Sequence, residues 1–498
     1  MAKKNILWIM TDQHRADCLG YMGHPVVKTP HLDSLAQTGV VFEKAFCQSP
    51  ACMASRASLL TGRYPEAVRV RGMGILPPSE TTFPEVLQRN GYSTGLFGKL
   101  HLTPELYTKH QLNKDIPVLD WKIYAKEAGL KPIPEDRFKK NYGFEMDEGC
   151  DDALRGRFKK WLKKKNPALL SKKPESLRKD GPGDLWVSPY TSETHQTTYI
   201  AEKAAEYIKT RGKGKKPWLT FCSFVAPHHP FEAPKDQIDK YPLENIPLPS
   251  KKGGVERKCI PYPASMAIGE FDKYSDEVKK LVARHYFASI SLVDDGVGRL
   301  IKVLKETGQL DNTVIIFTSD HGEFLGNHGM FRKPSLHYDE TLNVPLLIRL
   351  PKGKNGGRCV KGLVELTDVH PTLLGLLGLP VNDGVQGVNM SENILSGGKI
   401  GREDVYTDMF DITPQKFGKL SGPYMAVQTL RTMDWKLSIY PTAGRKYGQL
   451  FDLKNDPEES KNLYGELRYR EKREEMLWRL LSRVQKNTDP LPYWLTQY

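Results

Sequence analysis

The sequence predicts an α/β fold in which a mixed, mostly parallel sheet is flanked by helices and followed by a smaller C-terminal α+β domain. Two observations support this prediction. Over the first 100 residues, short apolar segments alternate with helical patterns, as expected for a parallel sheet with helices on both faces. Near the C-terminus, several short strand-like segments precede one charged helix. Hydrophobic residues make up 39% of the 498 residues, which is enough for a packed core.

The N-terminal elements follow the alternating pattern closely. We predict strands at 6–11, 40–46 and 92–97. The helices between them are expected at 31–37, 53–60 and 82–89. Gly39 and Gly62 end the first two of these helices, because glycine readily takes the left-handed conformation found just after a helix.

After residue 103 this pattern is lost, and the segment 103–194 is rich in Lys, Pro and Asp. It is too long for an ordinary loop, so we interpret it as an insertion over the active face that shapes substrate choice. Regular patterns return with predicted strands at 218–225, 313–318 and 344–349. The helices expected among them lie at 197–210, 276–306 and 371–377.

The C-terminal part begins with a Gly- and Asn-rich segment at 382–402 that we interpret as a linker. Short strands are predicted after it at 425–431, 435–439 and 449–452, and a charged helix at 467–485. This order indicates a small antiparallel sheet packed with a helix. We therefore assign residues 1–385 to a catalytic domain, which contains the insertion, and residues 386–498 to a smaller domain.

The formal net charge of +14 favours anionic partners. Much of the excess lies in the run 155–173, which holds nine basic residues and no acidic one. This run is either a solvated helix face or a rim that steers a polyanionic substrate. Nucleic-acid binding is not expected, because the chain has no recognisable DNA- or RNA-reading motif.

Apolar segments and cysteines in the sequence predict where the protein is located. No apolar stretch of roughly 18 residues exists, so no membrane contact is expected. The apolar segment behind the N-terminal lysines is too short for a signal peptide and is interrupted by Asp12, so we expect a cytoplasmic protein, or a periplasmic or secreted one if a signal has been trimmed. The seven cysteines form no CxxC pair, as expected for reduced thiols.

Cys52 begins the run Cys-Met-Ala-Ser-Arg at 52–56. At the start of a predicted helix it lies beside unpaired N–H groups and a partial positive charge, and Arg56, four positions on, shares its face. A reactive side chain, an anion-binding backbone and a guanidinium in one place fit an enzyme that acts on a tetrahedral oxyanion. A buried structural cysteine on a core helix is the alternative.

Two pairs of polar residues directly follow predicted strands. Asp12 and Gln13 follow the first strand, and Asp320 and His321 follow the strand at 313–318. Ligands bind at the carboxyl ends of strands in open α/β sheets, so both pairs point to one crevice. Two carboxylates, an amide oxygen and an imidazole suit a divalent cation; we expect Ca²⁺, with Mg²⁺ or Mn²⁺ as alternatives. Taken singly, each pair also fits a cap or a turn.

Three further segments supply candidate catalytic residues. Lys99 and His101 follow a strand, and alternate positions of an extended chain point the same way, so they can share a target. His228 lies in a proline-flanked turn that would hold its ring rigidly. Lys333 follows the second metal pair closely enough to reach back to it. Each of these residues, taken alone, also fits a solvated lysine or a turn histidine.

Together these segments resemble the signature of the sulfatases, which belong to the alkaline phosphatase superfamily. The run at 52–56 resembles the family's Cys-x-Pro-x-Arg motif, whose cysteine is oxidised to formylglycine, although Ala54 stands in place of the usual proline. Thr-Asp-Gln at 11–13 and Ser-Asp-His-Gly at 319–322 resemble its two metal-binding segments. The segments that contact the reacting group are matched by Gly-Lys-Leu-His at 98–101, Ala-Pro-His at 226–228 and Lys333.

The resemblance covers about residues 4–103 and 197–465, and it implies an alkaline-phosphatase-like fold and a sulfuric ester hydrolase. Cys52, converted to formylglycine by a maturation enzyme, would join the metal site and attack a sulfate monoester of a carbohydrate, such as a sulfated glycan, or of an aryl alcohol. A phosphonate monoester or phosphodiester hydrolase of the same superfamily is the alternative. A non-catalytic polyanion-binding protein with unmodified Cys52 is a further one.

The same resemblance implies a role for each remaining candidate. With the metal, Arg56, Lys99 and Lys333 would offset negative charge on the oxygens of the reacting group. His228, with Lys333, would assist the departing alcohol. His101 would deprotonate the second hydroxyl of the formylglycine hydrate, so that sulfate is expelled and the aldehyde returns.

Overall fold

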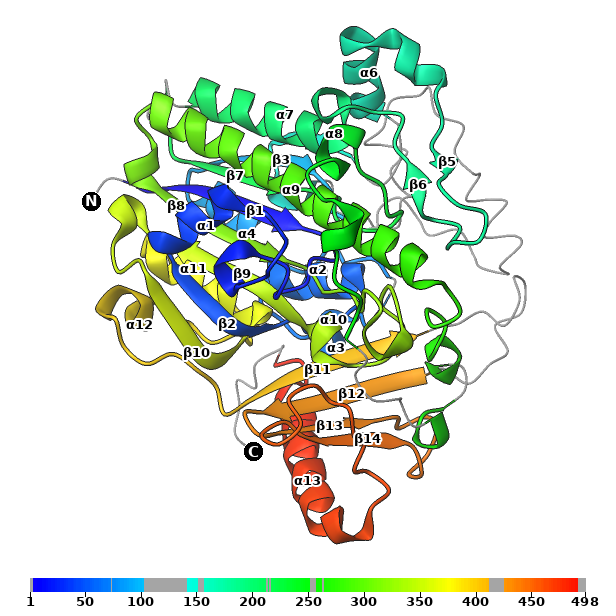
Figure 1. Ribbon diagram of the computed structural model, residues 1–498. Helices are drawn as coiled ribbons and strands as arrows, with labels where there is room; N and C mark the ends of the chain where they lie inside the picture. Colours follow the sequence, from blue (N-terminus) through cyan, green and yellow to red (C-terminus); the bar gives the residue numbers. More distant parts are fainter. Residues whose placement is uncertain are drawn as a thin grey trace, which may run out of the picture.

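The structure is a computed structural model that describes residues 3–72, 74–102, 141–150, 156–211, 214, 216–250, 257–261, 264–411 and 425–490. Much of the predicted insertion, at 103–140 and 151–155, lies outside these residues. Two sheets and the helices around them make up most of the described chain (Figure 1).

The larger sheet has eight strands in the order β10-β2-β9-β8-β1-β7-β3-β4 (Figure 1). β9 is antiparallel to its neighbours β2 and β8, whereas the other adjacent pairs are parallel. In chain order the strands are β1 (Asn5–Thr11), β2 (Val40–Phe46), β3 (Ser93–Gly98), β4 (Met146–Gly149), β7 (Trp218–Ser223), β8 (Thr313–Ser319), β9 (Asn343–Arg349) and β10 (Arg358–Glu365). The predicted mostly parallel sheet is confirmed.

Helices cover both faces of this sheet, and β1 shows why. Its side chains are buried on both faces, as is usual for a central parallel strand. Ile6, Trp8 and Met10 pack in one core, and Leu7 and Ile9 pack in another. The first core includes residues of α2 (Cys52–Thr61), α4 (Phe83–Arg89), α11 (Val369–Leu377) and α12 (Ser391–Ser396). The second includes residues of α1 (Pro30–Gln37), α6 (Gly156–Lys165), α7 (Gln196–Arg211) and α9 (Asp276–Glu306).

The smaller sheet is antiparallel and has the order β11-β12-β13-β14, with α13 (Arg470–Lys486) packed on it (Figure 1). Its strands are β11 (Asp404–Asp411), β12 (Met425–Thr432), β13 (Trp435–Ile439) and β14 (Gly448–Asp452). Leu437 and Leu450 of the sheet share a buried cluster with Met476 and Leu480 of α13. The predicted antiparallel sheet with one helix is confirmed.

Several elements escaped the sequence patterns because their sequences are polar or short. β4, Met-Asp-Glu-Gly, is an edge strand with no fully buried residue, and β10 at the opposite edge contains exposed residues as well. The segment 382–402, expected to be a linker, contains α12, which packs against α11. The shorter elements are α3 (Pro65–Val68), β5 (Glu175–Ser176), β6 (Trp186–Val187), α8 (Lys235–Ile238) and α10 (Asp339–Leu342).

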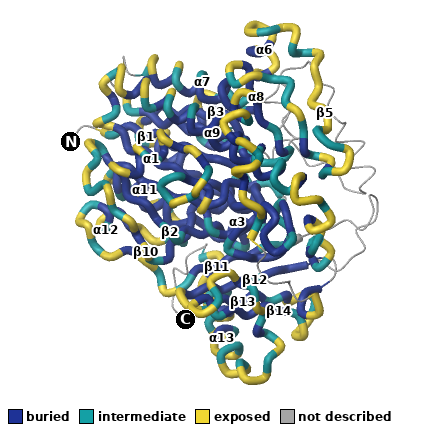
Figure 2. Tube along the Cα trace, viewed as in Figure 1, coloured by how far each residue is buried: buried dark blue, intermediate teal, exposed yellow. Residues whose placement is uncertain are grey.

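Burial follows this architecture. The inner strands of the larger sheet are largely buried, whereas α6 and α13 present exposed faces (Figure 2). Among the described residues, no helix is both long enough and apolar enough to cross a bilayer.

Candidate active site

The carboxyl ends of β8, β1, β7 and β3 lie next to one another, because these four strands are adjacent and parallel in the sheet. The predicted site residues leave from these ends and from the start of α2, so the structure brings all ten of them into one cluster. Their side chains are Asp12, Gln13, Cys52, Arg56, Lys99, His101, His228, Asp320, His321 and Lys333.

Cys52 is the first residue of α2, as the sequence predicted. All ten residues of this helix are buried, and it ends at Gly62, which has a left-handed φ of 69°. Cys52 itself is only 4% exposed. The thiol therefore sits inside the protein at a helix N-terminus, where backbone N–H groups favour negative charge.

Arg56 lies one turn after Cys52, 1% exposed, and binds both metal-pair aspartates. Its Nε donates to Asp320 Oδ2 at 2.7 Å, and its Nη2 donates to Asp12 Oδ2 at 3.2 Å. Its Nη1 donates to the Lys99 carbonyl at 2.8 Å and to Ser223 Oγ at 3.0 Å. Since a guanidinium has five N–H donors, most of them are committed to protein acceptors. The structure thus gives Arg56 the task of fixing both carboxylates.

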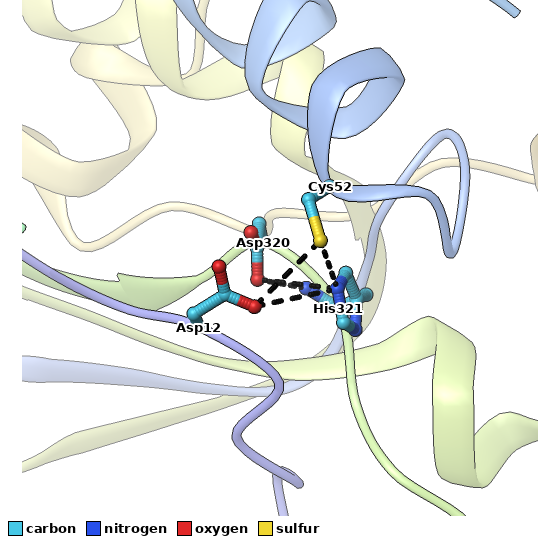
Figure 3. A group of neighbouring side chains, drawn as sticks. All are labelled: Asp12, Cys52, Asp320 and His321. Carbon is cyan, nitrogen blue, oxygen red and sulfur yellow. Dashed lines mark hydrogen bonds and ion pairs between the residues drawn. The ribbon is translucent and has the colours of Figure 1, made fainter. Parts of the chain in front are cut away.

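Four potential metal ligands lie together (Figure 3). One ligand atom from each of Asp12, Cys52, Asp320 and His321 lies within 4.8 Å of every other, and all four residues are buried. Cys52 Sγ lies 3.1 Å from His321 Nε2, which lies 3.5 Å from Asp12 Oδ1. Gln13 is tied to this group, because its backbone N–H donates to Asp320 Oδ1 at 3.1 Å.

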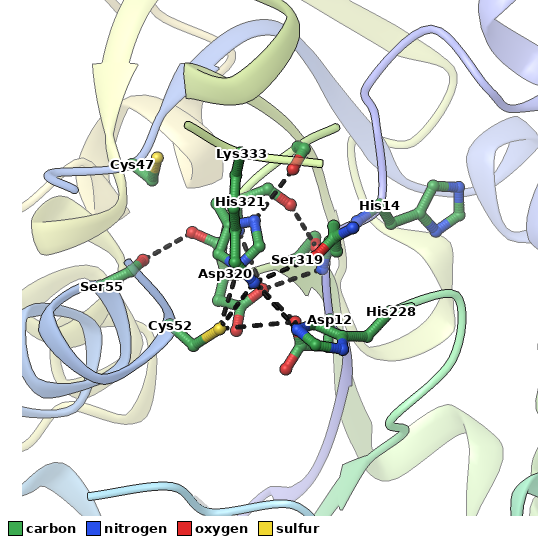
Figure 4. Close-up of polar contacts among 12 residues, drawn as sticks. Asp12, His14, Cys47, Cys52, Ser55, His228, Ser319, Asp320, His321 and Lys333 are labelled. Carbon is green, nitrogen blue, oxygen red and sulfur yellow. Dashed lines mark hydrogen bonds and ion pairs between the residues drawn. The ribbon is translucent and has the colours of Figure 1, made fainter. Parts of the chain in front are cut away.

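The ammonium of Lys333 lies among these groups (Figure 4). Lys333 Nζ is 3.0 Å from Cys52 Sγ and from Gln13 Oε1, and 2.9 Å from the Nε2 atoms of His228 and His321. Lys333 therefore does reach back to the metal pair, as its position in the sequence suggested.

Lys99 and the two predicted catalytic histidines complete the cluster. Lys99 is fully buried, with Nζ 3.0 Å from Asp12 Oδ2. His101, at a left-handed φ of 54°, and His228 both hydrogen-bond the Cys52 side chain. The ring of His228 also stacks on that of His229, with centroids 4.1 Å apart.

The charges of the cluster act on the thiol. Burial raises the pKa of Cys52, but the positive charges of Lys333 and His321, and hydrogen bonds from His101 and His228, outweigh burial and lower it well below its usual value. Burial and the Cys52 thiolate raise the pKa of Asp12, but Lys99 and the other cations lower it by more. The net shift of the Asp12 pKa is therefore downward. The site thus favours anionic forms of both groups.

Glu323 is a site residue that the sequence patterns did not single out. Fully buried, it accepts a hydrogen bond from Gln13 Nε2 through Oε2. Its Oε1 accepts the backbone N–H groups of Leu325, at 2.9 Å, and of Arg332. Glu323 therefore turns Gln13 Oε1 towards Lys333 and also pins the loop that carries Lys333. Its place directly after the Ser-Asp-His-Gly segment is the sequence signal that points to it.

Known proteins are similar to this chain over most of its length. Residues 4–379 match the family model described as "Sulfatase". An arylsulfatase of Clostridium perfringens is 30% identical over 94% of this chain and 92% of its own length. The chain belongs to the sulfatase family. It is therefore an enzyme of the sulfuric ester hydrolase type, and its resemblance to this family is confirmed. Residues 326–487 of this sulfatase also match a model described as "N-sulphoglucosamine sulphohydrolase, C-terminal".

Two more relatives frame the substrate question. An N-acetylglucosamine-6-O-sulfatase of Bacteroides thetaiotaomicron is 26% identical over 97% of this sulfatase and 86% of its own length. The crystal structure of a phosphonate monoester hydrolase of Agrobacterium radiobacter superposes with a TM-score of 0.79 and 26% identity, covering 99% of this chain and 98% of that one. The alkaline-phosphatase-like fold is thereby confirmed.

Proposed function

We propose that this sulfatase hydrolyses a sulfate monoester of a carbohydrate or aryl alcohol, using Cys52 after its conversion to formylglycine together with a divalent metal ion. One observation carries the proposal: Cys52, at the N-terminus of α2, shares a buried cluster with Asp12, Asp320 and His321. A structural cysteine would not need two carboxylates and a ring of cations around it. The arylsulfatase and N-acetylglucosamine-6-O-sulfatase relatives support both substrate classes.

The residues present fit a divalent metal. Asp12, Gln13, Asp320 and His321 would hold it, and their oxygens suit Ca²⁺ first, with Mg²⁺ or Mn²⁺ as alternatives. Gln13 Oε1 and His321 Nε2 already converge on a cation, the ammonium of Lys333, at 3.0 and 2.9 Å. When bound, the metal would act as a Lewis acid on the nucleophile and on the reacting group.

After its conversion, formylglycine at position 52 would supply a hydrated aldehyde, with one hydroxyl as the nucleophile towards sulfur and a second hydroxyl whose deprotonation would release sulfate and return the aldehyde. His101 hydrogen-bonds the side chain at this position, so it is placed to take the proton of the second hydroxyl.

Lys333 and His228 are placed to serve the leaving group. Their nitrogens lie 2.9 Å apart and both face the Cys52 side chain. A proton held between an ammonium and an imidazole can be delivered to the departing alkoxide, and the lysine charge remains to offset the negative charge of the sulfuryl oxygens. Lys99 keeps Asp12 ionised at 3.0 Å and so preserves the metal site.

The Cys52 position provides the test of this mechanism. Mass spectrometry of the peptide containing Cys52, from protein made in its native host, should show the aldehyde in place of the thiol. The Cys52→Ala variant should lose turnover of an aryl sulfate while keeping the melting temperature of the parent. An intact thiol in fully active native protein, or undiminished turnover by Cys52→Ala, would remove the mechanism.

A second candidate is phosphonate monoester hydrolysis. The match to the Agrobacterium radiobacter enzyme over nearly the full length of both chains favours it. Both substrates present a tetrahedral anion to the same cations. Parallel measurements of kcat/KM on an aryl sulfate and a phosphonate monoester decide between them, and a much higher value for the phosphonate would make the second candidate the main activity.

A further inference from the structure

We infer that the exposed face of α6 is a docking surface for a polyanionic glycan chain, separate from the residues that cleave the sulfate ester. This inference rests on the proposed function and specifies its substrate class as a sulfated polysaccharide. The docking face is defined by four exposed lysines of one helix: Lys159, Lys160, Lys163 and Lys164.

α6 is anchored so that this face points outwards. Phe158, Trp161 and Leu162 are buried beneath it. Trp161 Nε1 donates to Glu202 Oε1 of α7 at 3.1 Å, and the ring lies 5.5 Å from that of Tyr199. The helix is therefore firmly packed on one side, and the lysines occupy the other.

The lysines of the docking face lack acidic partners among the residues that the structure describes. Lys159 and Lys163, and likewise Lys160 and Lys164, are four positions apart, a spacing at which like charges destabilise a helix. Other cations around α6 are paired: Arg157 Nη1 lies 2.7 Å from Glu148, and Lys165 Nζ lies 2.9 Å from Glu202. The repulsion is thus confined to the docking face.

Another exposed helix shows what a merely solvated face looks like in this protein. In α13, Arg470 pairs with Glu474 at 2.9 Å, and Lys472 pairs with Glu475. Over residues 470–475 three cations alternate with three glutamates, which stabilise the helix and leave this stretch without net charge. Among the described residues, nothing acidic compensates the charge of the docking face, and an anionic polymer would offset it.

α6 also lies on the edge of the sheet that holds the active site. It follows β4, whose carboxyl end adjoins that of β3, since the Cys150 N–H donates to the Gly98 carbonyl at 3.1 Å. Lys99 directly follows Gly98, the last residue of β3. A chain bound along α6 therefore approaches the end of the sheet from which the site residues leave.

After α6, the chain comes close to the loops that carry His228 and Lys333. Asp184 lies 2.8 Å from Arg332, next to Lys333, and its carbonyl accepts the Phe231 N–H at 2.7 Å, three residues after His228. The segment 156–187 thus begins after β4, the neighbour of the strand that precedes Lys99, and reaches the loops of His228 and Lys333 at Asp184. α6 is therefore part of a continuous segment that ends in contact with the loop carrying Lys333.

The test separates docking from cleavage. In the docking variant, all four lysines of the face are changed to glutamine. The matched control removes four exposed lysines elsewhere in the described chain, Lys302, Lys305, Lys352 and Lys399, so both variants lose the same net charge. Binding of heparin, as a sulfated polysaccharide probe, is measured by calorimetry at two salt concentrations, and turnover is measured on a small aryl sulfate.

We expect the docking variant to bind heparin about tenfold or more weakly, with a shallower salt dependence, because fewer counterions are released. Its turnover of the aryl sulfate should stay within about twofold of the parent, whereas the control should keep both properties. Equal loss of heparin binding in both variants would reduce the effect to net charge and overturn the inference. Unchanged binding in the docking variant, or equally tight binding of double-stranded DNA by the parent, would overturn it as well.

If the parent turned over neither aryl sulfate nor phosphonate, the proposed function would fail while heparin binding remained measurable. The two failures are therefore distinguishable.

Discussion

At the scale of single residues, hydrogen bonds hold the buried polar groups of the site in fixed orientations. Gln13 is the clearest case, because an amide can present either oxygen or nitrogen to a metal. Glu323 accepts from Gln13 Nε2 and leaves Oε1 facing Lys333. Glu323 thereby decides whether Gln13 offers the metal site an oxygen ligand or an NH₂ group, which donates hydrogen bonds and does not bind a metal.

The Glu323→Gln variant tests this orientation. A glutamine can keep the backbone N–H bonds to Leu325 and Arg332 only through its oxygen, which leaves its NH₂ group facing Gln13 Nε2. Gln13 would then flip, and we expect affinity for Ca²⁺, measured by calorimetry, to fall about 10- to 100-fold. The double variant Gln13→Glu with Glu323→Gln reverses the hydrogen bond and should restore much of the affinity. Wild-type affinity in the single variant would show that Glu323 does not orient Gln13.

At the scale of elements, the strand ends carry the site, and Gly98 ends one of them. It pairs with Ser223 across β3 and β7 and has a φ of 91°. A Cβ at this position would lie 1.9 Å from the Ser223 carbonyl oxygen. Lys99, the residue that follows, is thus placed by a backbone approach that only glycine permits.

We therefore expect Gly98→Ala to lower the free energy of unfolding by roughly 4 kcal/mol or more, because the strand pairing must open. The control is Gly23→Ala, where φ is 86° but no atom lies within 4 Å of the added Cβ. That variant meets only the left-handed strain, about 1–2 kcal/mol. Urea unfolding measures both, and equal losses would mean that the close approach to β7 does not matter.

The strand ends also explain how much the sequence could reveal. Asp12, Lys99 and Asp320 were predictable because each directly follows an apolar strand, and parallel strands bring their ends together by rule. β4 and α12 were not, because their short polar sequences take structure only from their neighbours. The task of Arg56 lies equally beyond the sequence, since it depends on acceptors at positions 12, 99, 223 and 320 that only the folded chain brings within reach.

At the scale of the whole molecule, buried ion pairs join the C-terminal helix α13 to the larger sheet. Arg483 of α13 donates to Glu365 Oε1 at 2.8 Å and to Tyr64 Oη at 2.7 Å. Arg402 lies 3.3 Å from the other oxygen of Glu365, which is fully buried. Glu365 at the end of β10 is thus held by two cations, one of them from the C-terminal helix.

Removing one of these cations should destabilise the protein in a pH-dependent way. Burial raises the pKa of Glu365, but Arg402 and Arg483 outweigh burial and lower it. A carboxyl with a lowered pKa contributes stability above its unfolded pKa of about 4.3, and this contribution is lost as the pH falls through the folded value. We expect Arg483→Ala to cost about 2–4 kcal/mol at pH 7, and the difference from the parent to shrink below about pH 4.

Urea unfolding across this pH range measures the difference. The control is Arg470→Ala on the same helix, where an exposed pair with Glu474 should contribute little to stability. A pH-independent loss for Arg483→Ala would assign its effect to packing on Tyr64 rather than to Glu365.

The order of strands in the larger sheet also determines when the sheet can assemble while the chain is being synthesised. β1 pairs with β7 and β8, so the strand that precedes Asp12 gains its first sheet neighbour only after residues 218–223 have left the ribosome, and its second only after residues 313–319. Cys52 ends in the finished protein on a helix with every residue buried. At ~5–20 residues per second, roughly a quarter of a minute to a minute separates the synthesis of Cys52 from that of Lys333. A maturation enzyme that needs the thiol accessible has this interval, before the sheet closes around α2, in which to reach it.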